Sequence, residues 1–182
     1  MSKKKIAVLV GSLRKNSYSR QIANALIKLA PESIELEIVE IDKLPLYNQD
    51  SDNDIPEVYT EYRNKIKESD GVLFITPEHN RMMSAVIKNA IDVASRPWGH
   101  NVWDGKPSAV ISSSTGPLGG ALANHSVRQP LVILNSFVLQ QPEMYLGHVG
   151  SFFDEEGNLV KEDTAEFFKG FLDTFNNWVY KF

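Results

Sequence analysis

The sequence contains no cysteine among its 182 residues. Disulfide frameworks, zinc–thiolate sites, iron–sulfur clusters and thiol nucleophiles are therefore excluded. Long apolar runs are also missing, because no stretch approaches the roughly 20 residues that span a bilayer. The N-terminal segment lacks the order of basic, apolar and small residues that marks a signal peptide. These absences predict a cytoplasmic protein with no membrane insertion.

Neither sign of charge is in large excess. The chain has 19 lysines and arginines against 23 aspartates and glutamates, for a formal net charge of −4. This balance predicts no nucleic-acid partner. Hydrophobic residues make up 42% of the chain, as in ordinary globular proteins. The length predicts a single domain over residues 1–182.

Apolar runs that are typical of strands alternate with amphipathic segments that are typical of helices. The expected strands are residues 5–10, 34–41, 71–76, 108–112 and 137–139. The expected helices are residues 19–30, 58–69, 84–95, 119–135 and 164–180. Strand 34–41 has one polar face, which favours a sheet edge, and Pro130 predicts a kink in its helix. The alternation predicts an α/β fold: a flavodoxin-like three-layer sandwich whose five-stranded parallel sheet has the order 2-1-3-4-5.

Three polar loops follow the carboxyl ends of expected strands. They are residues 11–19, 77–80 and 113–120. In open parallel sheets, ligands bind beyond these ends, where the strand order reverses. The three loops are therefore the candidate ligand site.

The first loop, GSLRKNSYS, opens a helix whose N-terminus attracts anions. Hydroxyl groups of Ser12, Ser17 and Ser19 and the guanidinium of Arg14 can donate hydrogen bonds to an anion. A dinucleotide pyrophosphate favours G-x-G-x-x-G, whereas this loop has one glycine. The loop predicts a site for a terminal phosphate. The alternative is a serine-rich helix cap with Arg14 in solvent.

The second and third loops suit a flat ring. Backbone polar groups after the third strand can meet a heteroaromatic ring edge-on, from Pro77, Glu78, His79 and Asn80. Glycines in SSSTGPLGG allow close approach of the backbone. Together the three loops predict a mononucleotide with a large base.

The sequence offers no nucleophile of its own. It has no G-x-S-x-G elbow and no paired catalytic carboxylates, so a bound cofactor is expected to carry the chemistry. His79 is a candidate general base, with packing or hydrogen bonding as the alternative. Asp50, Asp52 and Asp54 lack the glycine and terminal glutamate of a calcium loop, so they indicate a solvated turn.

The stretches GSLRKNSYSR, TPEHN…IKNAIDVASRP, SSSTGPLGGA, VRQPLVILNSFVLQQPE and FFDEEGNLV…FLDTF carry a family resemblance. The chain resembles the NAD(P)H-dependent FMN reductases, flavodoxin-like proteins that include bacterial quinone, chromate and azo-dye reductases. The resemblance implies bound FMN, NADPH or NADH as electron donor, and a quinone, free flavin, azo compound or metal oxyanion as acceptor. It implies no catalytic residue, because the flavin carries the chemistry.

The resemblance also implies roles for the loop residues. The phosphate would be held by Ser12, Arg14, Ser17 and Ser19, assisted by the Tyr18 backbone. The flavin ring would be lined by Pro77, Glu78, His79 and Asn80, with its pyrimidine edge approached by Ser113 and Gly116. An apolar rim around the site, or alternatively core packing, is expected from Met82, Met83, Trp98 and Trp103.

Relatives are commonly homodimers or homotetramers, and Arg128 and Glu143 fall at positions that some of them use across subunit interfaces. The chain departs from the family pattern at His79, where tyrosine is usual, at Ser19, which is often asparagine, and at Pro130. Two rivals to the reductase remain at this point. One is a non-enzymatic one-electron carrier of the flavodoxin type. The other is a phosphate-ligand binding protein with no redox role.

Overall fold

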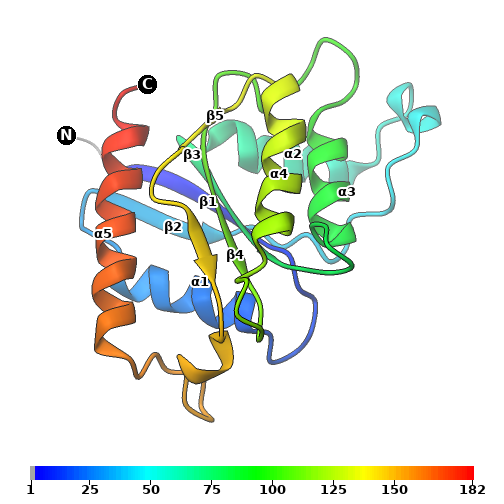
Figure 1. The fold of residues 1–182 in the computed structure, drawn as a ribbon. Helices are drawn as coiled ribbons and strands as arrows, with labels where there is room; N and C mark the ends of the chain where they lie inside the picture. The colour runs from blue at the N-terminus through cyan, green and yellow to red at the C-terminus, as the bar shows by residue number, and fades with distance from the viewer. Residues whose placement is uncertain (1–2) are drawn as a thin grey trace.

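The computed structural model describes residues 3–182 and contains a six-stranded sheet (Figure 1). Its strands are β1 (Lys4–Val10), β2 (Ile34–Ile38), β3 (Gly71–Pro77), β4 (Pro107–Ser113), β5 (Phe137–Val138) and β6 (Met144–Leu146). The order is β2-β1-β3-β4-β5, and every pairing is parallel. The predicted order is confirmed. Strand β6, which pairs with β4, is an addition that the sequence analysis does not predict.

Helices cover both faces of the sheet, which confirms the three-layer prediction. They are α1 (Tyr18–Leu29), α2 (Glu57–Glu68), α3 (Ala85–Ala94), α4 (Ala121–Ile133) and α5 (Glu162–Val179), with 3₁₀ turns η1 (Gln49–Asp52) and η2 (Val149–Ser151). Figure 1 shows α1 and α5 on one side of the sheet and α2, α3 and α4 on the other. Within residues 3–182, no helix combines the length and apolarity needed to cross a membrane.

Each face of the sheet has its own apolar core. Against one face, Phe168, Phe171 and Phe175 of α5 pack with α1. Against the other, residues of α2, α3 and α4 pack around the fully buried Trp103, whose indole Nε1 donates to the Ile91 carbonyl oxygen at 3.0 Å. The indole N–H is the only polar group of that side chain, and it has a hydrogen-bond partner. Burying Trp103 therefore leaves no polar group unsatisfied.

The four candidates for an apolar rim divide into two groups. Trp103 and Met83 belong to the core, so the rim interpretation is wrong for both. Met82 and Trp98 are exposed and can still serve as a rim. Sequence alone does not separate them because the core and an apolar rim favour the same residue types.

Two further expectations concern edges and breaks. Strand β2 lies at the sheet edge, as its polar alternation predicts, but it ends at Ile38. Helix α4 continues through Pro130 to Ile133, so the proline does not end it.

In the acidic turn, Asp52 accepts hydrogen bonds from Arg96 and from the Tyr47 hydroxyl, so this carboxylate is engaged within the chain.

Asp70 ties the starts of β1 and β3 together. Its carboxylate accepts hydrogen bonds from the Lys5 backbone N–H at 2.7 Å and from Lys4 Nζ at 3.1 Å. Burial raises the pKa of Asp70, but these two hydrogen bonds and the charges of Lys4 and Lys106 together outweigh burial, and the net pKa is lowered. The bonds therefore stabilise the fold fully above the ordinary aspartate pKa of about 3.9, and the contribution is lost as pH falls through the lower folded value.

Asp70→Asn should accordingly be less stable than wild type at neutral pH, with the difference shrinking as the solution is acidified below pH about 4. Urea unfolding across this range measures the difference directly. A gap between the two proteins that stays constant with pH would contradict the role of the Asp70 charge.

Candidate active site

The loop after β1 is held in place by a close backbone approach. The N–H of Gly11 donates to the Ile75 carbonyl oxygen at 2.7 Å, at the end of β3. A Cβ at position 11 would lie 2.8 Å from side-chain atoms of both Ile87 and Ser84. Any other residue would have to displace the Ile87 and Ser84 side chains, so close packing explains the single glycine of the loop.

Ser17 starts helix α1. It has an extended backbone conformation, and its Oγ accepts a hydrogen bond from the Arg20 backbone N–H at 3.2 Å. Its carbonyl oxygen accepts from Arg20 and Gln21. The hydroxyl proton of Ser17 is not used in that cap. Ser17 therefore serves as the helix cap and can still donate to an anion in front of the helix.

The predicted residues largely converge on one cavity of about 210 Å³ at the carboxyl ends of β1, β3 and β4. Predicted residues that line it are Ser12, Arg14, Ser17, Tyr18, Ser19, Pro77, Glu78 and Ser113. The structure adds Ser114, Thr115 and Val149. His79, Asn80 and Gly116 do not line this cavity, although they are close to it along the chain.

The additional residues have different origins. Ser114 and Thr115 belong to the SSSTGPLGG motif, so they could have been predicted from that motif as cavity residues. Val149 is placed in the cavity wall by β6 and η2, two elements that no sequence pattern predicts. The Ser114 carbonyl oxygen accepts from the Val149 N–H at 3.2 Å, and this bond brings the two segments together.

The cavity is electrostatically suited to an anion. Arg14 is exposed, and across residues 3–182 no carboxylate lies within ion-pair distance of it. Ser17 and Ser19 are each 2% exposed and stand at the positive end of α1. A guanidinium that shares a cavity with buried hydroxyls at a helix N-terminus is a donor set that suits a phosphate.

Glu78 is the one acidic residue in the cavity wall. Its side chain is 10% exposed, and its Oε1 accepts from Arg81 Nη1 at 2.8 Å. Its Oε2 faces the start of α4, where the Ala123 N–H lies at 3.4 Å. Arg81 and the helix N-terminus therefore compensate the Glu78 charge, so it does not cancel the attraction for an anion.

His79 lies outside the cavity and takes part in a hairpin. Its backbone N–H and C=O exchange hydrogen bonds with Met82, each at 3.0 Å. Asn80 and Arg81 between them have φ angles of 49° and 63°, a left-handed pair typical of a tight two-residue turn. The turn carries Arg81 back toward Glu78, and the His79 ring is exposed on the surface beside the cavity.

Ser17→Ala should lower the free energy of unfolding of the ligand-free protein by about 1 kcal/mol, because the helix cap is lost. Ser12→Ala is the matched control, since Ser12 lines the same cavity but makes no side-chain hydrogen bond within the described chain. Its stability should stay within about 0.5 kcal/mol of wild type. Urea unfolding checks both values, and equal stabilities for the two variants would refute the capping role.

Known proteins resemble this chain along nearly its whole length. Residues 4–150 match the family described as NADPH-dependent FMN reductase. A quinone reductase from Pseudomonas putida is 52% identical over 175 residues, which cover 96% of this chain and 94% of the relative. A 2-hydroxy-1,4-benzoquinone reductase from Burkholderia sp is 47% identical, with 96% of each chain covered.

A solved structure agrees with these relatives. The flavoenzyme NAD(P)H:(acceptor) oxidoreductase FerB from Paracoccus denitrificans superimposes with a TM-score of 0.92. It is 42% identical, and the match covers 98% of both chains. Sequence, fold and the chemistry of the cavity thus lead to one assignment: this chain belongs to the NADPH-dependent FMN reductase family.

Proposed function

We propose that the cavity at the carboxyl ends of the strands binds FMN through its phosphate, and that the chain reduces a quinone-type acceptor with electrons from NAD(P)H. The observation that carries this proposal is the unpaired Arg14 guanidinium beside the buried Ser17 and Ser19 hydroxyls at the N-terminus of α1. When bound, FMN supplies the two-electron chemistry that links a nicotinamide to the acceptor.

The residues present fit this cofactor. A cavity of about 210 Å³ is smaller than the 300–1,000 Å³ typical of whole-ligand pockets, so it suits the phosphate end of the ligand. The flat ring then extends along the neighbouring loops, past Pro77 and Ser113, which are paired across β3 and β4. His79, Asn80 and Gly116 belong to this outer part of the proposed site.

The protein positions its ligands and shapes their surroundings. The helix dipole, Arg14 and the serines fix the phosphate, so the ring hanging from it has a defined orientation. Glu78 is restrained by Arg81 and keeps the chain beside the ring in place. The exposed Met82 and Trp98 can shield a stacked nicotinamide or acceptor from water. No side chain needs to form a covalent bond with the substrate.

The absorption spectrum of the purified holoprotein tests the proposal. Without oxygen, NADPH or NADH should bleach the bound flavin fully, and benzoquinone should restore the colour. A flavin that NADPH and NADH leave unbleached would instead support the one-electron carrier. A protein that stays colourless after incubation with FMN would support a phosphate-ligand binding protein without a redox role.

The names of the relatives favour a quinone as the acceptor. We infer that benzoquinone is reduced with a higher kcat/KM than an azo dye, free flavin or chromate under the same donor. Steady-state assays with each acceptor make the comparison, and a preference for any of the other three would redirect the substrate assignment.

We further propose that the chain forms a homodimer or homotetramer through the outer face of α4. Val132 and Ile133 on this helix are 74% and 84% exposed, and Leu118 and Leu122 at its start are exposed as well. A monomer would leave these four apolar side chains in water, next to the exposed His125 and Gln129. Arg128 bonds within its own chain, to Asn124 Oδ1 and the Leu139 carbonyl oxygen. Glu143 accepts from the Tyr145 hydroxyl.

Ile133→Lys should shift the protein toward monomers in sedimentation equilibrium, because a charge would be placed in an apolar contact. Val160→Lys is the control, since Val160 is 58% exposed but lies between η2 and α5, away from α4 in sequence. If both variants keep the wild-type mass, or if the wild type is already monomeric, the proposed α4 interface is wrong.

A further inference from the structure

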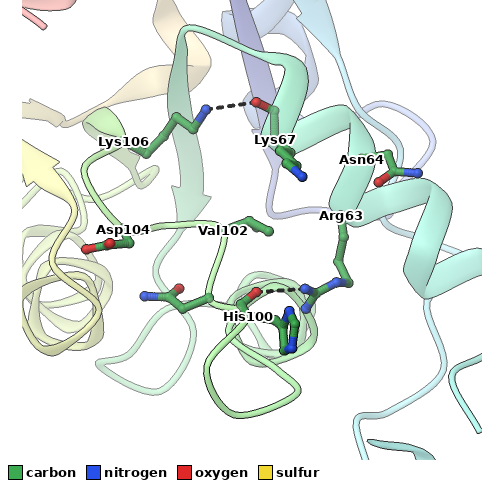
Figure 2. Close-up of a pocket in the computed structure, with 8 residues that line it drawn as sticks. Arg63, Asn64, Lys67, His100, Val102, Asp104 and Lys106 are labelled. Atoms are coloured by element: carbon green, nitrogen blue, oxygen red, sulfur yellow. Dashed lines mark hydrogen bonds between the residues drawn. The ribbon is translucent and has the colours of Figure 1, made fainter.

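A second polar cavity of about 390 Å³ lies between α2 and the segment that joins α3 to β4 (Figure 2). It is lined by Arg63, Asn64, Lys67, His100, Asn101, Val102, Asp104 and Lys106. It shares no residue with the proposed FMN site. Lys106 precedes the first residue of β4, whereas Ser113 of the FMN site is the last, so strand length separates the two by about 20 Å.

Three cations line this cavity, and Figure 2 shows Lys106 and Arg63 at opposite ends of it. Within the part of the chain that the structure describes, Arg63, Lys67 and Lys106 form no ion pair with a carboxylate. Asp104 is the one acid in the lining. Figure 2 shows it across the cavity from Arg63, and its Oδ1 accepts from Asn135 Nδ2 at 2.7 Å.

Backbone carbonyl groups fix two of these cations in place. Arg63 donates to the Val93 carbonyl oxygen at 3.3 Å and to that of His100 at 2.7 Å. Lys106 Nζ donates to the carbonyl oxygens of Lys67 and Ser69. Neutral acceptors orient both groups but leave their charges uncompensated. Each also keeps unused N–H donors, since arginine has five and lysine three.

Partial burial makes these charges costly to leave unpaired. Burial lowers the pKa of Arg63 and of Lys106, which shows that both have lost part of their hydration. Asp70, whose charge acts on the pKa of Lys106, is already bonded to Lys4. Anionic groups bound along the cavity would compensate these charges and accept hydrogen bonds from the unused donors.

We propose that this cavity binds a small molecule that carries phosphoryl groups, with Arg63 and Lys106 as fixed donors at its two ends and Lys67 as a mobile third donor. A dianion suits the site because its lining carries three lysine and arginine charges against one aspartate. The exposed His100 at the mouth adds a donor. The proposal does not depend on the function assigned to the FMN site.

Titration of isotope-labelled, FMN-saturated protein with inorganic pyrophosphate tests this, at ionic strength held constant with sodium chloride. Saturation with FMN keeps pyrophosphate out of the Arg14 cavity. The backbone amide signals of Val102 and Gly105 should shift and saturate, whereas those of Ser12 and Tyr18 should not move. A parallel titration with ADP shows whether a diphosphate carried on a metabolite binds at the same amides.

Lys67→Glu should weaken pyrophosphate binding about tenfold or more, because a donor is replaced by a repelling charge. The fold is spared, since the Lys67 side chain is exposed and its backbone carbonyl still accepts from Lys106. Lys65→Glu is the matched control: the same charge change, two residues away on α2 and outside the cavity lining. Its affinity should stay within about twofold of wild type.

Three results would overturn the proposal. One is a shift of Val102 and Gly105 that grows linearly without saturation. Another is an equal loss of affinity in the two lysine variants, which would indicate only a general effect of net charge. The third is binding that appears at Ser12 and Tyr18 alone. A protein that does not hold FMN would be recognised by its missing flavin absorbance. The amide shift of Val102 would still report pyrophosphate binding at the second cavity.

Discussion

Arg14→Ala is expected to weaken FMN binding by about 1.5–3 kcal/mol, or roughly 10- to 150-fold, the range for a hydrogen bond to a charged group. Arg14 lines the cavity and lies within ion-pair distance of no carboxylate in residues 3–182, so its charge is available to the phosphate. Titration of flavin-free protein with FMN, followed by fluorescence quenching, measures the effect.

Two companion variants sharpen this test. Lys15→Ala removes the same charge from the next residue, which is exposed and does not line the cavity, so FMN affinity should change little. Arg14→Lys should recover part of the affinity, because it restores the charge without the forked geometry of the guanidinium. Equal losses for Arg14→Ala and Lys15→Ala would reduce the role of Arg14 to long-range attraction.

Gly119→Ala should destabilise the protein by about 2–5 kcal/mol, from the left-handed backbone and from overpacking together. Gly119 has a φ of +59°, and a Cβ there would lie 2.6 Å from the Tyr145 carbonyl oxygen. The β4–α4 loop is held by Ser112 Oγ of β4, which donates to the Gly119 carbonyl oxygen, and β6 is held by its pairing with β4. The variant should also retain less FMN, since this loop carries Ser113, Ser114 and Thr115 of the cavity.

Gly116→Ala in the same loop provides the comparison. The nearest atom to its added Cβ, Ser114 Oγ, is 3.6 Å away, which is an ordinary contact. The ligand-free Gly116→Ala protein should therefore be as stable as wild type or slightly more so. Thermal and urea unfolding of the two variants measure the contrast. A Gly119→Ala protein of wild-type stability would show that the loop is more adaptable than its geometry implies.

Local chemistry made the cavity in front of α1 predictable from sequence. The apolar run that ends before Gly11, and the serines that open the next helix, determine a strand, a turn and a helix N-terminus within one short segment. The parallel topology then gathers the ends of β3 and β4 at the same edge. Ser12 and Ser113 could thus be placed together although the chain separates them by a large distance.

Contacts that depend on distant partners were not predictable in this way. Strand β6 is three residues long, and it exists because Met144, Tyr145 and Leu146 pair with β4. Trp103 is in the core because the Ile91 carbonyl oxygen meets its indole. The second cavity brings Arg63 of α2 near Lys106 before β4, two residues that no local pattern connects.

A crystal structure of the protein saturated with FMN tests the central claim most directly. The phosphate should lie in front of α1, within hydrogen-bond distance of Arg14 and of the Ser17 and Ser19 hydroxyls, with the flavin ring along the 77–80 loop. An FMN phosphate bound at any other place on the molecule, with Arg14 left in solvent, would contradict it.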